Sequence, residues 1–308
     1  MNQEWTFIHA ADMQPGSPKS YRFKPAFQEN WNTAKKQIRE LKPELLLLGG
    51  DLTRDGSIHK WELQEMKEDL DSLNIPYHAV PGNMDTGNKH TQKPGPNPDR
   101  RDLELNITPS QLQQFEQVFG TSNWTFLHRN IRFTGFCDIL LGSKLPEEDR
   151  LWEWLRQLPE KNTPSRHVVI MHYAMFIDDL HEESFDITQK DQYLSWYFGL
   201  NKPEREQLLQ IFKAAGVTDV ITGHIHRMRE IKREGITFTY APGIAFGQWE
   251  DHWKDGDSSL GFLEYKVKGE TFEKRFIPLA RVSERTDGYG LGGHPPPEMR
   301  DYSAAWEK

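Results

Sequence analysis

The sequence has very little cysteine: Cys137 is the only one among 308 residues. A single cysteine excludes a disulfide within the chain and a metal site built from several thiolates. No apolar run reaches the roughly 18 residues that a membrane-spanning helix needs. The N-terminus also lacks the basic stretch and apolar core of a signal peptide. We therefore expect a cytoplasmic protein that has no membrane partner.

An excess of basic charge is also missing. The chain has 38 basic and 46 acidic side chains, which gives a formal net charge of -8 at pH 7. Such a chain repels phosphate backbones, so we expect no nucleic-acid partner. We find no internal repeat and no linker. We expect a single domain over residues 1–280 and an extended tail, rich in glycine and proline, over residues 281–308.

Apolar residues recur at helical spacing between short apolar runs, a pattern typical of strands that alternate with helices. The predicted strands lie at 5–11, 45–48, 77–80, 124–128, 131–137, 167–171 and 217–221, and the predicted helices at 25–41, 59–73, 147–157 and 203–214. The alternation near the N-terminus predicts right-handed crossovers and a parallel sheet. Between 228 and 278 the pattern favours antiparallel hairpins. Residues 86–102 and 173–201 read as long loops, which are often functional.

Polar residues follow five of these strands at the point where each strand ends. They lie in Asp12-Met13-Gln14, Gly50-Asp51, Gly82-Asn83-Met84-Asp85, His172 and Gly223-His224-Ile225-His226. Because ligands bind at the carboxyl ends of strands in open α/β sheets, we expect these side chains to converge. Carboxylates can bridge two cations, and imidazoles suit zinc, iron or manganese. Two ions about 3.5–4 Å apart can hold a phosphoryl group and activate water.

The five motifs, taken in order over residues 5–245, resemble those of the calcineurin-like metallophosphoesterase superfamily. The resemblance implies an α/β fold, a four-layer α/β/β/α sandwich of two mixed β-sheets flanked by helices. It also implies a metal-dependent phosphoesterase, in which metal-bound hydroxide attacks a phosphorylated small molecule or phosphoprotein. Two divalent metal ions would be needed, with Mn, Fe, Zn and Mg all open. The first ion would be held by Asp12, Gln14, Asp51 and His226, and the second by Asp51, Asn83, His172 and His224.

Two positions depart from the family pattern. Gln14 stands where the family has a histidine, and its amide oxygen is a weaker ligand for a borderline metal. We therefore expect a weaker first site, or one that prefers a harder ion. Met84 stands where the family has a histidine that the acid at Asp85 orients. A thioether cannot donate a proton, and general acid catalysis typically contributes about 10²–10⁴-fold.

Met84 leaves several functions open. The chain could be an enzyme for substrates with good leaving groups, or an enzyme in which another residue supplies the acid. It could also bind a metal or a phospholigand without turnover, or hydrolyse a substrate that contains no phosphate. Our catalytic candidates are Asn83, Asp85 and His90. Further candidates for the acid are His252, Lys89, Lys93, Arg100 and Arg101.

Structural explanations compete with these assignments. Asp12 and Asp51 could be helix N-caps, and the basic run at 89–101 could be a solvated loop. His224 and His226 are harder to explain by packing, because two histidines beside a glycine gain little from it. Trp249 and Trp253 could either rim the site or pack in the core, and His9 is expected in the core or just behind the site.

Overall fold

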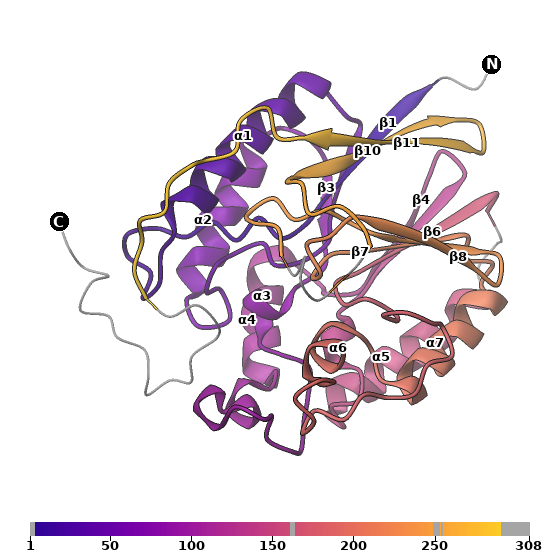
Figure 1. Cartoon of the computed structure of the whole chain (residues 1–308). Helices are drawn as coiled ribbons and strands as arrows, with labels where there is room; N and C mark the ends of the chain where they lie inside the picture. The colour runs from indigo at the N-terminus through magenta and orange to yellow at the C-terminus, as the bar shows by residue number, and fades with distance from the viewer. Residues whose placement is uncertain (1–3, 161–163, 249–252, 254, 291–308) are drawn as a thin grey trace.

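The computed structural model describes residues 4–160, 164–248, 253 and 255–290. Two β-sheets pack face to face in it, with helices on their outer sides (Figure 1). The first sheet has the order β11-β10-β1-β2-β3 and the second β4-β5-β6-β7-β9-β8. The strands of the first sheet are β1 (Trp5–Ala10), β2 (Leu45–Leu48), β3 (Tyr77–Ala79), β10 (Gly261–Lys268) and β11 (Thr271–Pro278). Those of the second are β4 (Trp124–His128), β5 (Ile131–Gly135), β6 (Arg166–Met171), β7 (Asp219–Thr222), β8 (Arg229–Arg233) and β9 (Ile236–Tyr240).

Strand β1 shows how the layers share their apolar residues. Successive side chains of a strand point to opposite faces. Trp5 and Phe7 therefore pack between the sheets, where the ring of Phe7 lies 5.3 Å from that of Phe133. Ile8 and Ala10 face the helical layer. Both faces are buried, which explains why the inner strands read as continuous apolar runs.

The helices cover the outer face of each sheet (Figure 1). They are α1 (Pro25–Leu41), α2 (Lys60–Asp71), α3 (Asn83–Thr86), α4 (Pro109–Phe119), α5 (Pro146–Arg156), α6 (Tyr193–Phe198) and α7 (Lys202–Ala214). Short 3-10 turns are η1 (Pro98–Arg100), η2 (Asp102–Leu105), η3 (Asp138–Leu140) and η4 (Leu158–Glu160). In α1 the buried residues Trp31, Ala34 and Ile38 recur at helical spacing and pack on the first sheet.

Most of the predicted elements are confirmed, with ends that shift by one or two residues. Strands β1, β2 and β3 are parallel as predicted, and β8–β9 and β10–β11 are antiparallel hairpins. Helix α4 was missed, although Thr108 and Gln111 form a capping box at its start, with Pro109 in the first turn. The predicted loop at 173–201 contains α6, and the one at 86–102 contains η1.

Residues 281–290, the start of the predicted tail, form no helix or strand. They lie along α1 (Figure 1), where the backbone N–H of Ser283 donates to Asn30 Oδ1 over 2.7 Å. The backbones of Tyr289 and Phe23 pair with each other. The rest of the tail lies outside the described residues, and the domain boundaries stay a prediction. None of the described helices is long and apolar enough to cross a membrane.

Candidate metal centre

The predicted metal ligands converge at one edge of the two sheets. Asp12, Gln14, Asp51 and Asn83 follow strands of the first sheet, and His172, His224 and His226 follow strands of the second. All seven are buried. Ligand atoms of Asp51, His172 and His224 lie within 4.8 Å of one another, and so do those of Asp12, Asp51 and His226. Two groups that share one carboxylate can hold two neighbouring cations.

The backbone is unusual at these positions. Five of the seven residues have a positive φ, which costs a non-glycine residue of order 1–3 kcal/mol. They are Asp12 (56°), Gln14 (40°), Asp51 (51°), His224 (68°) and His226 (54°). The neighbouring backbone is equally tight, because a Cβ on Gly82 would lie 2.1 Å from the amide nitrogen of Asp51. Sharp turns held at such a cost are typical of functional sites.

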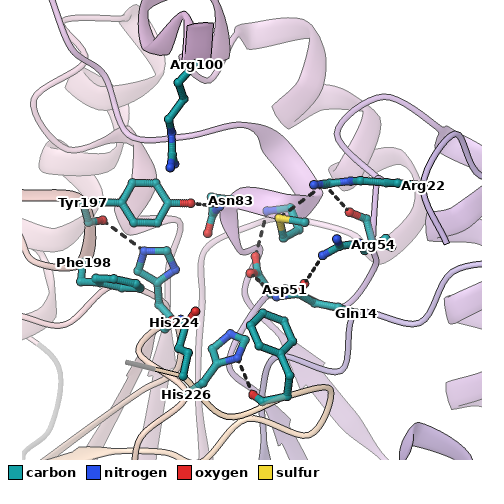
Figure 2. A pocket seen from close by; sticks show the side chains of 13 residues that line it. Gln14, Arg22, Asp51, Arg54, Asn83, Arg100, Tyr197, Phe198, His224 and His226 are labelled. Atoms are coloured by element: carbon teal, nitrogen blue, oxygen red, sulfur yellow. Dashed lines mark hydrogen bonds between the residues drawn. The ribbon is translucent and has the colours of Figure 1, made fainter. Parts of the chain in front are cut away.

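Backbone carbonyls orient the three histidines. Nδ1 of His172 lies 2.8 Å from the carbonyl of Gly49, and Nδ1 of His226 lies 2.8 Å from that of Phe246. In His224 it is Nε2 that faces a carbonyl, 3.1 Å away on Tyr197 (Figure 2). A carbonyl only accepts, so each of these nitrogens carries a hydrogen. His172 and His226 therefore present Nε2 to the centre, and His224 presents Nδ1.

The electrostatics of the centre favour positive charge. Burial lowers the pKa of His172, but Asp51 and other carboxylates outweigh burial and raise this pKa to about 10. His226, 3.0 Å from Asp12, also has a raised pKa, because the attraction of Asp12 outweighs burial. The pKa of His224 falls well below its usual value through burial and the nearby charge of His172. Buried carboxylates that recruit protons in this way are suited to divalent cations, which would displace those protons.

The amide of Gln14 is held by two neighbouring side chains. Its amide Nε2 donates to Asp51 Oδ2 over 3.0 Å, and its Oε1 accepts from Arg54 Nη1 over 3.1 Å (Figure 2). Arginine has donors only, so it holds the oxygen of Gln14 towards itself. Asn83 behaves differently, since its Oδ1 lies 3.1 Å from Nε2 of His172, at the second ligand group.

Asp85 has a structural task at this site. Its carboxylate accepts hydrogen bonds from the backbone of Leu52 and Gly82, and from both N–H and hydroxyl of Thr53. Burial, and then the charge of Asp51, raise its pKa to about 7. Asp85 therefore ties the turn after Asp51 to α3, and it does not line the cavity described below. Asp138, which sequence reasoning missed, accepts similarly from the backbone N–H of His172 over 2.7 Å.

A cavity of about 310 Å³ opens over the ligand groups (Figure 2). Its lining is Gln14, Arg22, Asp51, Arg54, Asn83, Met84, Arg100, Tyr197, Phe198, His224, His226, Phe246 and Gln248. Met84 lies in the wall, with its sulfur 3.8 Å from Nη2 of Arg22. Sequence reasoning missed Arg22 and Arg54, because each stands alone in its segment and no local pattern marks it.

The remaining candidates for the proton donor differ in whether they line the cavity. His90 does not line it, and burial lowers the pKa of this half-buried side chain. The amine of Lys89 is buried and donates to the carbonyl of Gly199. Lys93 and Arg101 are exposed. Among the described candidates of the 86–102 loop, Arg100 alone lines the cavity.

Four further aromatic and histidine residues were considered from the sequence. His252 and Trp249 lie outside the described residues. Trp253 is buried, with its ring 5.8 Å from that of Phe198. His9 is fully buried in β1, in keeping with the core position that was expected.

Known proteins resemble this chain in sequence. The model of the calcineurin-like phosphoesterase family matches residues 6–228. The chain belongs to this family. Serine/threonine-protein phosphatase CPPED1 of Danio rerio is 27% identical over 92% of this chain and 89% of the relative. Its counterpart from Bos taurus is 23% identical over 92% of this chain and 88% of the relative. The predicted resemblance is confirmed.

Solved structures agree on the fold. A dimetal phosphatase from Danio rerio has a TM-score of 0.53 at 15% identity and covers 90% of this chain and 99% of its own. Purple acid phosphatase PPD1 from yellow lupin has a TM-score of 0.59 at 13% identity. The match covers 94% of this chain and 54% of the lupin protein. Identities this low show the fold alone, and they confirm the four-layer sandwich.

The family and the two ligand groups together identify a metal-dependent phosphoesterase, a hydrolase that uses divalent metal ions on phosphorylated substrates. This confirms the predicted reaction class over the alternative of a protein that binds without turnover. At this site Gln14 and Met84 differ from the family pattern that the sequence analysis described. A mechanism has to account for both residues.

Proposed function

We propose that this phosphoesterase works with two divalent ions that share Asp51, and that it hydrolyses phosphorylated small molecules or phosphoproteins. The two buried ligand groups with one common carboxylate are the observation that carries the proposal. The names of the curated relatives, serine/threonine-protein phosphatases, support phosphorylated proteins as one substrate class.

The ligand atoms divide between the two positions. Asp12, Asp51 and His226 would hold the first ion, and Asp51 with Asn83, His172 and His224 the second. When bound, such ions act as Lewis acids towards the phosphoryl oxygens and lower the pKa of water. The chain supplies the fixed geometry, because carbonyls orient each imidazole and Asp138 holds the backbone of His172.

Residue 84 cannot protonate the oxygen of the leaving group. Met84 contacts Arg22 and has no acidic hydrogen to give. Cationic side chains at the cavity can stabilise negative charge on oxygen without transferring a proton. We therefore expect the enzyme to act faster on aryl phosphates, which have good leaving groups, than on alkyl phosphates.

The decisive experiment is hydrolysis of p-nitrophenyl phosphate by protein loaded with Mn²⁺. We expect turnover that needs the metal, and an Asp51→Asn variant that loses at least about 100-fold in kcat, because both ions lose a shared ligand. The exposed Asp99→Asn serves as a matched control and should retain full activity. Failure of the wild-type protein to hydrolyse any phosphate ester, or undiminished activity of Asp51→Asn, would refute the proposal.

A further inference from the structure

A bend at residues 243–246, which follows β9, lies behind the first ligand group. The carbonyl of Phe246 faces Nδ1 of His226 over 2.8 Å (Figure 2), and the two rings lie 4.4 Å apart. The backbone N–H of Ala245 donates to the carbonyl of Asp12 over 2.9 Å. The bend therefore contacts two residues of the first group, and such outer partners fix the orientation of metal ligands.

Helix α1 holds this bend at two points. Nδ2 of Asn30 donates to the carbonyl of Ala245 over 2.9 Å, and the ring of Phe27 stacks on that of Phe246 with 5.0 Å between the ring centres. Asn30 is the one polar side chain among the buried residues of α1, a helix that the structure describes throughout. A buried amide without partners costs about 1–3 kcal/mol, so the contacts that Asn30 makes hold it in one orientation.

The other end of the Asn30 amide meets residues 281–290, which we call the strap and which lie along α1 (Figure 1). Oδ1 of Asn30 accepts from the backbone N–H of Ser283 over 2.7 Å. Further along the strap, the backbones of Tyr289 and Phe23 exchange two hydrogen bonds of 3.0 Å. Asn30 thus connects the strap to the bend behind the metal ligands.

The two ends of this amide are not equivalent. Its oxygen can only accept a hydrogen bond, and its nitrogen can only donate one. Because the N–H of Ser283 engages Oδ1, the amide is held with Nδ2 towards the carbonyl of Ala245. The next residue is Phe246, whose own carbonyl orients His226. A series of directional contacts therefore leads from the strap to the imidazole.

We propose that Asn30 is a positioning residue for His226, and that the strap acts through Asn30 on the affinity of the first metal position. The inference rests on the proposed function, because it concerns the first of the two ions. Asn30 contributes no ligand atom, and instead it fixes the backbone that directs Nε2 of His226 to the centre. Loss of either half of this bridge should weaken metal binding at the first position and leave the second unchanged.

The test is a calorimetric titration of the metal-free full chain with Mn²⁺. Asn30→Ala should raise the dissociation constant of the first site by about 10-fold, as for loss of a partner behind a ligand. The second site should stay within about 2-fold, because separate sites respond nearly independently. His226→Ala identifies which site is the first. Asn32→Ala removes an exposed asparagine of the same helix and, as the matched control, should behave like the wild type.

Nuclear magnetic resonance gives a readout at the imidazole itself, without metal or turnover. The Nδ1 proton of His226 should give a resolved signal, because it is buried and donates to the carbonyl of Phe246. In Asn30→Ala this signal should shift and exchange faster with water. The Nδ1 proton of His172, which donates to the carbonyl of Gly49, should not change. A general loss of packing would move both signals.

Substitutions at Ser283 test the strap half of the bridge. Ser283→Pro removes the backbone N–H and should raise the dissociation constant of the first site as much as Asn30→Ala does. Ser283→Ala keeps the N–H and should stay close to the wild type. Asn30→Asp keeps the acceptor for Ser283 but turns an oxygen towards the carbonyl of Ala245, so it should weaken the first site although the strap contact remains.

The outcomes separate this inference from the proposed function. An unchanged first site in Asn30→Ala, equal losses at both sites, or an unmoved His226 signal would overturn the assignment of Asn30. A Ser283→Pro variant with wild-type affinity would overturn the role of the strap. A wild-type protein that binds a single Mn²⁺ or hydrolyses no phosphate ester would instead refute the proposed function, and the His226 signal, measured without metal, would still decide on Asn30.

Discussion

At the scale of single residues, Gln14 shows how one hydrogen bond can change a metal site. The family pattern suggests a ligand at this position, but Arg54 engages the amide oxygen and Asp51 receives the amide N–H. Gln14 thus connects a guanidinium group to the shared carboxylate. In this arrangement the amide of Gln14 positions Asp51, the carboxylate that both ligand groups share.

This geometry predicts unequal effects on metal binding. Gln14→Ala should weaken the first Mn²⁺ site by about 10-fold, as for loss of an outer partner of a ligand. Asp12→Asn, which removes a ligand, should weaken it by at least about 100-fold. Calorimetric titration of the metal-free proteins measures both affinities. Equal losses in the two variants would show that Gln14 is a ligand.

At the scale of elements, the strands carry buried polar groups that link stability to pH. His167 lies in β6, where its Nε2 is 2.8 Å from the hydroxyl of Thr134 on β5 and its Nδ1 is 3.1 Å from the carbonyl of Ala215. Burial lowers its pKa to about 4. The unfolded chain therefore takes up a proton below about pH 6.5 that the folded chain does not.

The lowered pKa of His167 means that the folded protein loses stability as the pH falls. The folded pKa lies below the unfolded one, so the contribution is complete above about pH 6.5 and is lost as the pH falls towards 4. Between pH 7.5 and 5 His167 should remove about 2 kcal/mol of unfolding free energy. Urea unfolding in the presence of a chelator measures it for the wild type and His167→Gln. The variant should lose less stability over this range, and parallel pH curves would contradict the assignment.

Element types were predictable wherever periodicity is strong. The four-residue run Leu45–Leu48 is buried on both sides and formed the predicted strand. Helix α1 has the predicted ends, because its apolar face and Pro25 mark them locally. Helix α6 has no such mark, since its six residues are too few for a periodic pattern and are held by packing among aromatic rings.

At the scale of the whole molecule, the candidate ions would connect the two sheets. Asp12, Asp51 and Asn83 come from the first sheet, and His172, His224 and His226 from the second. Each ligand group contains residues of both sheets. Metal binding should therefore stabilise the folded sandwich as a unit.

The expected size follows from binding linkage. Mn²⁺ at about 100 times its dissociation constant should add about 2.7 kcal/mol for each site, and the Tm should rise by several degrees. Differential scanning calorimetry with and without a chelator measures the shift. Asp51→Asn should largely abolish it, whereas Asp99→Asn should retain it. If Mn²⁺ does not change the Tm of the wild-type protein, a metal site shared between the two sheets would be contradicted.

The sequence by itself determined the strands, the helices with a clear apolar face such as α1, and the residues that end each strand, because periodicity and glycine positions are local properties. It also determined the donor types of the metal centre. Only the tertiary structure decided which nitrogen of each histidine faces inward, that Arg54 engages Gln14, and that Arg100 lines the cavity. These contacts join residues far apart in the chain, so they depend on how the two sheets pack, and no local pattern encodes them.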